Sequence, residues 1–320
     1  MKKIAVLTSG GDAPGMNACL RAITRYAIYK NLEVYGVERG YEGLIRDDIF
    51  PMSSRSVSDI IQRGGTFLKS ARSADFATPE GLEKAYKNLR VHGITTLIVI
   101  GGDGTLRGGK ELSDKYDVNV IGIPGTIDND LQYTDYTLGF DTAVNTCLTA
   151  INNLRDTMSS HDRCSLVEVM GRSCGDIAIY AGVGGGAEYI LVPEIPYDLD
   201  EIAKNLKRSR EKGKTSNMIV FAEGAGNRDE IAAYLKEKSG TKITKVTLGH
   251  IQRGGSPTMA DRTLAAQFAL HAIDLILEGG RNRVVGIHDN KIIDMDIGEA
   301  LNMPRVVDSK LYEAAMILAL

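Results

Sequence analysis

The sequence predicts a two-domain α/β protein in which each domain has a mainly parallel central sheet flanked by helices. The chain alternates short apolar runs with longer segments of helical period throughout its length. Strands that alternate with helices of this length pair in parallel through β-α-β units. At 320 residues the chain is also long enough for two hydrophobic cores, because one domain takes roughly 100–200 residues.

The elements of the first half follow from this alternation. Strands are predicted at Ile4–Leu7, Glu33–Glu38, Thr95–Ile100 and Val118–Ile123. Helices are predicted from Met16 to Tyr29, from Val57, from Pro79 to about Val91, and after the glycines at 101–104. Pro79 suits the first turn of a helix, which needs no N–H at that position. The glycine-rich segments 9–15, 40–43 and 63–66 are predicted to be turns or loops.

The second half repeats this pattern. A long amphipathic helix is predicted between Phe140 and Leu154, where apolar residues recur every three or four positions. Strands are predicted at Ser165–Met170, Tyr189–Val192, Met218–Ala222 and just before His250. Helices are predicted at Asp176–Gly182, Leu199–Glu211, Asp229–Lys238 and Arg262–Glu278. Val284–Ile287 and Lys291–Met295 are predicted to form a hairpin around Asp289-Asn290.

The composition is that of an ordinary globular protein and argues against several classes of function. Hydrophobic residues make up 43% and charged residues 25%, and the net charge of −3 gives no reason to expect nucleic acid or an anionic membrane as a partner. The four cysteines lack metal-ligand spacing and are expected to be reduced thiols, as in a cytoplasmic protein. The first apolar run is too short for a signal peptide. No run approaches the roughly 20 apolar residues of a membrane span.

Three glycine-rich turns, at Gly10–Gly15, Gly101–Gly109 and Gly171–Gly175, each follow a predicted strand and precede a helix. Such turns expose backbone N–H groups at a helix N-terminus, which suits phosphate. None matches a standard nucleotide fingerprint, because Met16-Asn17 stands where a P-loop has Lys-Ser/Thr and Arg107 takes the third glycine position of G-x-G-x-x-G. Any one turn could be simple loop geometry. Three together, two of them with an aspartate, favour phosphate and metal handling.

Carboxylates stand where two of the predicted strands end. Asp103 lies between glycines after Thr95–Ile100, and Asp128 and Asp130 follow the strand that ends near Ile123. One such carboxylate can hold Mg²⁺ while another accepts the proton of a hydroxyl, which is what phosphoryl transfer needs. The alternative for the segment 128–130 is a plain acidic turn.

Four arginines in predicted loops add positive charge to this pattern: Arg72, Arg163, Arg172 and Arg253. Individually each could be a solvated side chain, whereas as a set they suit a phosphorylated substrate. His161 and His250 stand out only by position, and His161 is expected to have an ordinary packing or hydrogen-bonding role. The sequence holds no G-x-S-x-G, H-E-x-x-H or cysteine–histidine cluster, which argues against nucleophilic hydrolysis and zinc chemistry.

Five motifs follow one another along essentially the whole chain. They are Gly10-Gly11-Asp12-Ala13-Pro14-Gly15-Met16-Asn17, Gly101-Gly102-Asp103-Gly104-Thr105, Pro124-Gly125-Thr126-Ile127-Asp128-Asn129-Asp130, Met170-Gly171-Arg172 and Gly249-His250-Ile251-Gln252-Arg253-Gly254-Gly255. This set resembles the bacterial ATP-dependent 6-phosphofructokinases. The resemblance implies transfer of the γ-phosphoryl group of MgATP to the 1-hydroxyl of fructose 6-phosphate. It also implies a larger ATP-binding domain at 1–139 plus about 252–303 and a smaller sugar-phosphate-binding domain at 140–251 plus about 304–320, with the active site in the cleft between them.

The resemblance assigns roles to individual residues. Asp128 is implied as the general base, Thr126 and Asp130 as flanking the transferring group, and Arg172 as neutralising its charge. The implied ATP site comprises Gly11, Tyr41, Arg72, Ser73, Gly102, Asp103, Gly104, Thr105 and Gly108, with Asp103 holding Mg²⁺. The implied fructose 6-phosphate site shares the four catalytic residues and adds Met170, Gly171, Glu223, His250, Arg253 and, from a neighbouring subunit, Arg163.

Two glycines bear on the identity of the phosphoryl donor. Pyrophosphate-dependent members of the family carry Asp where this chain has Gly104 and Lys where it has Gly125. A side chain at Gly104 would occupy the region of the α-phosphate, so the two glycines favour ATP. The alternatives are a pyrophosphate-dependent enzyme, a kinase for another sugar phosphate, and a non-catalytic nucleotide sensor on the same fold. The intact catalytic carboxylates and Arg172 argue against the last of these.

The resemblance further implies a homotetramer with an effector site between subunits, where ADP activates and phosphoenolpyruvate inhibits. The implied effector residues are Arg21, Arg25, Arg55, Asp59, Arg155, Glu188, Lys212 and Lys214. The first two are four residues apart on one predicted helix and therefore share a face. A solvated basic stripe is the alternative for that pair.

The sequence departs from the family pattern at three positions. Ser54 stands where the effector pattern has an arginine, and Thr215 replaces a lysine, so regulation is expected to be weakened or altered. Thr244 stands where a second arginine is expected to cross the subunit boundary to the sugar phosphate. Lys242 and Lys245 lie nearby, but a strand shift of one residue would turn Lys245 to the other face.

Overall fold

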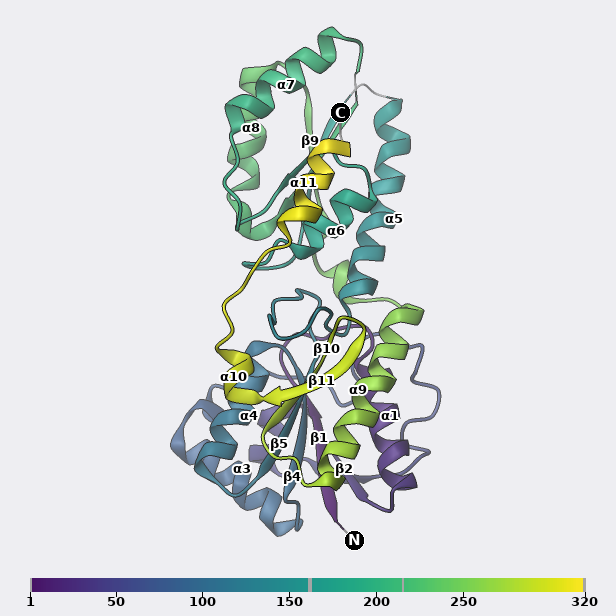
Figure 1. Ribbon diagram of the computed structural model, residues 1–320, viewed down its shortest axis with the longest axis vertical. Helices are drawn as coiled ribbons and strands as arrows, with labels where there is room; N and C mark the ends of the chain where they lie inside the picture. The colour runs from purple at the N-terminus through teal and green to yellow at the C-terminus, as the bar shows by residue number, and fades with distance from the viewer. Residues whose placement is uncertain (1, 161–162, 215, 319–320) are drawn as a thin grey trace. The chain divides into compact units, whose positions relative to one another are not determined.

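The computed structural model describes residues 2–160, 163–214 and 216–318 and divides into two compact units (Figure 1). Unit 1 comprises Met1–Ile127, Leu131–Thr142 and Arg253–Arg305, and unit 2 comprises Asp128–Asp130, Ala143–Gln252 and Val306–Leu320. Each unit has a mainly parallel sheet flanked by helices, which confirms the predicted α/β fold. His161 and Thr215 lie outside the described residues.

Among the described residues, the sheet of unit 1 has seven strands in the order β11-β10-β5-β4-β1-β2-β3. The inner strands are parallel, whereas the two edge strands, β3 and β11, run antiparallel to their neighbours. The strands are β1 (Lys3–Thr8), β2 (Glu33–Val37), β3 (Ile49–Met52), β4 (Thr96–Gly101), β5 (Asn119–Pro124), β10 (Arg283–His288) and β11 (Lys291–Asp296). All residues of β4 and β5 are buried, as expected for central strands covered on both faces.

Helices cover both faces of this sheet. On one face, α2, α3, α4 and α10 pack apolar side chains against alternate strand residues such as Leu97 and Val99. On the other face, α1 and α9 lie side by side (Figure 1). The helices are α1 (Met16–Tyr29), α2 (Gly40–Arg46), α3 (Pro79–Val91), α4 (Asp103–Lys115), α9 (Met259–Glu278) and α10 (Ile297–Leu301), and the short 3-10 helix η1 covers Asp75–Ala77.

Among the described residues, unit 2 has a four-stranded parallel sheet in the order β7-β8-β6-β9. The strands are β6 (Cys164–Val169), β7 (Tyr189–Leu191), β8 (Asn217–Ala222) and β9 (Ile243–Thr247). Helices α7 and α8 bury their apolar faces on this sheet with Leu166, Ile219 and Phe221. The helices are α5 (Phe140–Ser159), α6 (Asp176–Gly184), α7 (Leu199–Glu211), α8 (Arg228–Ser239) and α11 (Ser309–Leu318), and the 3-10 helices are η2 (Glu223–Ala225) and η3 (Gly249–Arg253).

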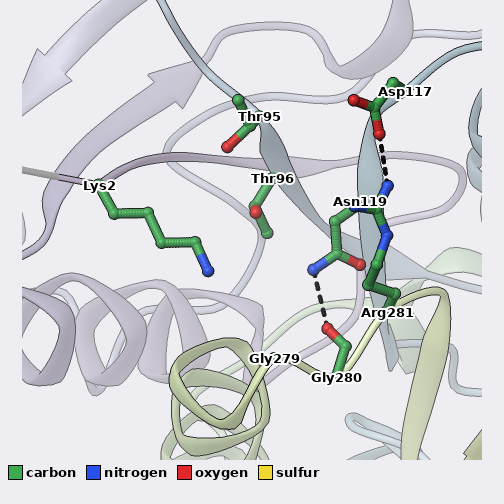
Figure 2. Close-up of a pocket in the computed structure, with 8 residues that line it drawn as sticks. All are labelled: Lys2, Thr95, Thr96, Asp117, Asn119, Gly279, Gly280 and Arg281. Carbon is green, nitrogen blue, oxygen red and sulfur yellow. Dashed lines mark hydrogen bonds and ion pairs between the residues drawn. The ribbon is translucent and has the colours of Figure 1, made fainter.

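A polar pocket of about 290 Å³ lies where β1, β4 and β5 begin, near the end of α9 (Figure 2). Lys2 Nζ donates to Ile276 O at 2.9 Å, and Asn119 Nδ2 donates to Gly280 O at 3.0 Å. These bonds satisfy carbonyl groups at and just after the C-terminus of α9, which would otherwise lack partners. The pocket therefore belongs to the amino-terminal edge of the sheet, which is the edge away from the predicted site loops.

Several predicted helices have the expected bounds, because their capping signals are local. For α1, α3 and α7 the prediction matches the observed first and last residues. Thr78 Oγ1 accepts the Gly81 N–H at 3.1 Å at the start of α3, immediately before Pro79. Within the described residues, no helix is long and apolar enough to cross a bilayer.

Other predictions were wrong. Segment 40–43 begins a helix, α2, although it contains two glycines; burial of Tyr41 and Leu44 outweighs the low helix propensity of glycine. No helix forms from Val57, because the chain passes through successive turns in which Asp59 has a φ of +54°. α9 begins at Met259 rather than Arg262, because Thr258 caps it. The elements β3, α10 and α11 were not predicted.

Candidate active site

Three of the predicted site loops leave neighbouring strands of unit 1. The turn 9–15 follows β1, Gly102 and the start of α4 follow β4, and Thr126 follows β5. The sheet order places these three strands side by side. The ladder continues into the turns, since Ser9 N–H donates to Ile100 O at 3.1 Å and Gly125 N–H donates to Gly101 O at 3.0 Å. Open α/β sheets bind ligands at the carboxyl ends of adjacent parallel strands. The predicted residues of these three loops therefore share one edge of one sheet.

The start of α4 offers the features that phosphate binding requires. The helix begins at Asp103, so its first N–H groups open toward this edge of the sheet. The Asp103 carboxylate is partly exposed and accepts a hydrogen bond of 2.8 Å from Arg107 Nε, one turn further on. A Cβ added to Gly104 would meet no atom within 4 Å. N–H donors, a carboxylate and open space together suit the phosphates of a nucleotide.

The same segment fits the implied Mg²⁺. Among the described residues, no three His, Cys, Asp or Glu side chains cluster closely enough to hold a metal on their own. Mg²⁺ commonly takes only one or two carboxylates from the protein and completes its shell with phosphate oxygens and water. A single Asp103 at the start of a helix, beside space for phosphate, is a donor set of this kind.

Arg253 lies against the turn that follows β1. Its Nη1 donates to Asp12 O at 3.4 Å, and a Cβ added to Gly11 would collide with the guanidinium. Any larger residue at position 11 would therefore require the end of this arginine side chain to move. The structure brings together Gly11, predicted to contact ATP, and Arg253, predicted to contact fructose 6-phosphate.

Tyr41 is buried against the first turn of α4. It is 6% exposed, its hydroxyl donates to Thr105 O at 2.5 Å, and its ring stacks on Phe76 with 4.0 Å between centroids. Gly108 lies against both rings, because an added Cβ would be 3.0 Å from Tyr41 and 3.2 Å from Phe76. Burial raises the pKa of Tyr41, so the hydroxyl remains a donor. Two residues predicted at the ATP site thus pack against each other.

The loop before η1 carries the other two predicted ATP contacts. Ser73 Oγ donates to Glu42 Oε2 at 2.6 Å and accepts from Phe76 N–H at 3.2 Å. The hydrogen bond that Ser73 Oγ donates is the main reason that the pKa of Glu42 is lowered. Arg72, next to Ser73, is exposed. The serine therefore shapes the loop, while the arginine is open to solvent.

In unit 2, Asp128 faces an arginine. The aspartate is 2% exposed, and its Oδ2 is 3.5 Å from Nε of Arg172, whose side chain is 58% exposed. Asn129 has a φ of +52° and donates from Nδ2 to Asp176 Oδ2 at 2.9 Å, in the first turn of α6. Asp130 follows and is partly buried. An ionised carboxylate can accept a proton and a guanidinium can stabilise negative charge, so these two side chains are close enough to act on one substrate.

The loop that carries Arg172 has a strained backbone. Gly171 has a φ of +135°, and a Cβ there would collide with Cys174 O. Arg172 itself has a φ of +55°, a left-handed conformation that costs a non-glycine residue about 1–3 kcal/mol. Its N–H donates to Glu223 Oε1 at 2.8 Å, which holds the turn in place. Glu223, predicted as a substrate contact, therefore supports Arg172, the residue predicted to stabilise the transferring group.

Two supporting residues were missed by sequence reasoning. Glu194 Oε1 accepts the Gly175 N–H at 2.9 Å, and Gln252 Oε1 accepts the Met170 N–H at 3.1 Å. Gln252 lies inside a motif quoted above, so its place between two predicted substrate residues was the available signal. For Glu194 the sequence holds no signal, because its partner is 19 residues away. His250, in η3, is exposed.

Arg163 lies at the amino end of β6, at the opposite end of that strand from Met170 and Arg172. In one chain, the structure does not bring it to the other predicted substrate residues. Lys242 is its neighbour, because Cys164 N–H donates to Lys242 O at 3.1 Å and Cys164 pairs with Ile243. Lys245 Nζ instead bonds Asp229 Oδ1 at 2.8 Å.

The predicted effector residues divide between the units. In unit 2, Arg155 Nε donates to Gly185 O at 2.7 Å and its Nη2 donates to Gly186 O. Glu188, two residues further on, pairs with Lys214 Nζ at 3.1 Å. The structure therefore brings Arg155, Glu188 and Lys214 to one side of unit 2, with Lys212 exposed nearby. In unit 1, the four remaining positions lie on α1 and in the turns after β3: Arg21, Arg25, Arg55 and Asp59.

Comparison with known proteins gives consistent results. A family model described as phosphofructokinase matches residues 3–276. An ATP-dependent 6-phosphofructokinase of Clostridium tetani is 57% identical over 319 residues, covering 100% of both chains. A solved phosphofructokinase of Saccharomyces cerevisiae matches with a TM-score of 0.90 at 35% identity, and the match covers 100% of this chain and 48% of that one. A solved pyrophosphate-dependent phosphofructokinase of Marinobacter aquaeolei shares the fold. It matches with a TM-score of 0.85 at 22% identity, and the match covers 99% of this chain and 92% of that one. This chain belongs to the phosphofructokinase family.

Proposed function

We propose that this chain is an ATP-dependent 6-phosphofructokinase, which converts fructose 6-phosphate and MgATP to fructose 1,6-bisphosphate and ADP. The observation that carries the proposal is the buried Asp128 carboxylate beside the Arg172 guanidinium. This carboxylate follows β5 in the chain, and β5 lies next to β4, the strand that leads into the start of α4. Family membership and the name of the Clostridium tetani relative support the same reaction.

In the proposed step, Asp128 accepts the proton of the 1-hydroxyl while the hydroxyl oxygen attacks the γ-phosphorus. The bond between that phosphorus and its bridging oxygen breaks, and ADP leaves. Arg172 stabilises the negative charge of the transferring group, and Thr126 and Asp130, on either side of Asp128 in the chain, orient it. A general base contributes roughly 10²–10⁴ in rate, and a charge-stabilising arginine can contribute roughly 10³–10⁵.

The nucleotide phosphates are proposed to lie on the N–H groups of the turn after β1 and of the start of α4. Asp103 would hold Mg²⁺, which neutralises charge on the β- and γ-phosphates when it is bound. Because Asp103 already bonds Arg107, that arginine would have to share or release the carboxylate when the metal enters.

The space around two glycines supports ATP as the donor. No atom lies within 4 Å of a Cβ added to Gly104, so the region expected for the α-phosphate is open. A Cβ added to Gly125 would lie 3.0 Å from Ile100 Cγ2 and 3.2 Å from Met16 Cε. A lysine at position 125, as in the pyrophosphate-dependent enzymes, would therefore require these side chains to move.

The proposed function is tested by comparing donors and acceptors on the purified protein. Formation of fructose 1,6-bisphosphate is measured with MgATP and, separately, with magnesium pyrophosphate. We expect turnover with MgATP and none with magnesium pyrophosphate. Turnover with magnesium pyrophosphate and none with MgATP would reverse the donor assignment. Fructose 1-phosphate, which lacks the free 1-hydroxyl, serves as the matched negative acceptor. A protein that binds ATP but phosphorylates no sugar phosphate would instead be a nucleotide sensor.

We further propose that Lys242 takes the place of the second cross-subunit arginine. It neighbours Arg163 at the amino edge of the unit 2 sheet, and Thr244 follows two residues later on the same face. Lys245 points elsewhere and is paired with Asp229. Two adjacent cations would suit the 6-phosphate of a substrate bound by a neighbouring subunit.

A homotetramer regulated by ADP and phosphoenolpyruvate is proposed as the working assembly. An effector site is supported by the position of Arg155, which bonds Gly185 O and Gly186 O two residues before the Glu188–Lys214 ion pair. Light scattering after size exclusion would measure the mass, and turnover against fructose 6-phosphate with each effector would measure the regulation. The cytoplasm is the proposed compartment, because all four cysteines are free and buried.

A further inference from the structure

Gln252 is a fully buried amide whose polar groups are all directed at specific partners. Its exposure is 0%. Its Oε1 accepts two hydrogen bonds of 3.1 Å, from the Met170 N–H and the Cys147 thiol, and its Nε2 donates to Gly249 O at 3.0 Å. A buried amide without partners would cost several kcal/mol on transfer from water. These three bonds therefore account for the presence of a polar side chain at this buried position.

The chemistry of the partners fixes the orientation of this amide. Burial raises the pKa of Cys147 to about 12, so its thiol stays protonated and can act as a donor. The Met170 N–H is also a donor, and both face Oε1, whereas Gly249 presents an acceptor to Nε2. A flipped amide would place donor against donor on one side and acceptor against acceptor on the other.

Gln252 continues the connection between two strands after their backbone ladder has ended. The last paired residues of β6 and β9 are Glu168 and Thr247, and Leu248 N–H donates once more, to Glu168 O at 3.1 Å. Beyond that point the side chain of Gln252 joins the loop after β6 to the turn after β9. Both of these segments carry predicted fructose 6-phosphate contacts.

The loop after β6 depends on such external bonds. Gly171 and Arg172 both have positive φ values, and the N–H groups at either side of Gly171 are bound by side chains from other strand ends. Gln252 binds the Met170 N–H, and Glu223 binds the Arg172 N–H. Removal of one of these bonds releases one end of a strained turn, and with it the guanidinium that faces Asp128.

We propose that Gln252 is a positioning residue for the phosphoryl transfer. It fixes the Met170–Arg172 loop to the Gly249–Arg253 turn, so that the two segments present their substrate contacts in a set geometry. This inference rests on the proposed function, since it concerns how fructose 6-phosphate is held. Gln252 itself acts through its neighbours and is not a catalytic residue.

Gln252→Glu provides the sharpest test, because its effect depends on pH. When protonated, the new carboxyl keeps an acceptor for the Met170 N–H and donates its proton to Gly249 O, as the amide does. When ionised, it has no donor, and its oxygen faces the Gly249 carbonyl. We expect the KM for fructose 6-phosphate to be close to that of the parent at about pH 6 and to rise roughly 10- to 100-fold toward about pH 9. A pH profile that parallels the parent would overturn the proposal.

Gln252→Met and Cys147→Ala form the matched pair for neutral pH. The methionine keeps volume but removes all three bonds, so it should raise the KM for fructose 6-phosphate roughly 10-fold or more and lower kcat, with the KM for ATP unchanged. Cys147→Ala removes one donor to the same oxygen, touches neither loop, and should leave all these constants within about twofold. Equal changes in the KM values for both substrates would indicate a general distortion of the site and contradict a positioning role.

Hydrogen exchange separates this proposal from the proposed reaction. Exchange of the amides of Met170 and Arg172 is measured on the parent protein and on Gln252→Met, whether or not either one turns over. Faster exchange at these amides, with unchanged protection in α7 and α8, is expected. If the parent does not phosphorylate fructose 6-phosphate but the loop loosens as expected, the reaction assignment fails and the positioning contact stands. Unchanged exchange in a folded variant would refute the contact itself.

Discussion

Asp128→Asn is the substitution that tests the proposed chemistry most directly. Asparagine keeps the shape of the side chain but cannot accept a proton at neutral pH. We expect kcat to fall by roughly 10²–10⁴, which corresponds to about 2.7–5.4 kcal/mol of activation free energy at 1.36 kcal/mol per tenfold change. The KM for ATP should change little, because the predicted nucleotide contacts lie in the turn after β1, on α2, in the loop before η1 and at the start of α4.

The cost of this substitution to folding should be much smaller than its effect on rate. The ion pair that is lost joins Asp128 to a guanidinium whose side chain is 58% exposed, at 3.5 Å. Solvent screening limits such a pair to about 1 kcal/mol or less. A loss of that size would lower the melting temperature by no more than about 4 °C in a protein larger than 150 residues.

The assay follows ADP formation at saturating MgATP and fructose 6-phosphate, and calorimetry follows the melting temperature. Asp135→Asn is the matched control, because it neutralises an exposed carboxylate five residues after Asp130 that pairs with His288. It should leave kcat unchanged. A folded Asp128→Asn protein with kcat within about tenfold of the parent would refute the base assignment.

Three further outcomes are expected. Gly104→Asp should lower kcat/KM for ATP by roughly tenfold or more in steady-state assays. The variant should melt at the same temperature as the parent, because an added Cβ meets nothing within 4 Å. A kcat/KM equal to that of the parent would show that ATP does not use this space. Lys242→Ala should raise the KM for fructose 6-phosphate roughly tenfold. Lys245→Ala removes only the ion pair with Asp229 and should leave this KM unchanged. Equal effects of the two substitutions would contradict the proposed role of Lys242. The hydrogen bond that the Asp135 carboxylate accepts from the His288 ring raises the pKa of His288 above its ordinary 6.5. This pair therefore stabilises the fold below pH 6.5, and the contribution is lost as pH rises through the folded pKa. Asp135→Asn should therefore return the His288 pKa toward 6.5 in an NMR titration, and an unchanged titration would exclude Asp135 as the cause.

Elements whose signals are local could be predicted from the sequence. α1, α3 and α7 have the predicted bounds, because apolar periodicity, a capping side chain or an N-terminal proline lies within a few residues of each end. α2 was missed because its stability comes from tertiary burial of Tyr41 and Leu44, which no local window contains. β3 was missed because Pro51 lies within a very short run; an edge strand tolerates this residue, which has no N–H to donate.

The candidate site divides in the same way. The convergence of the loops after β1, β4 and β5 follows from parallel pairing of strands that the sequence marks clearly. The contacts that support the Arg172 turn could not be predicted in this way. Glu223 is 51 residues from Arg172 along the chain, and Gln252 is 82 residues from Met170. Their roles depend on which strand ends lie side by side, and that order is a property of the whole sheet.

The pairing of β10 with β5 has a consequence for how this protein is made. Ile121 on β5 pairs with Arg283 on β10, and the sheet of unit 2 is built entirely from residues between them. During synthesis, strands β6 to β9 of unit 2 leave the ribosome before the β10–β11 hairpin exists. Unit 2 is thus able to complete its sheet while the β5 edge of unit 1 is still open, which leaves an unpaired strand edge available for misassociation. A nascent chain paused after α9 should therefore depend on chaperones more than a chain released at full length.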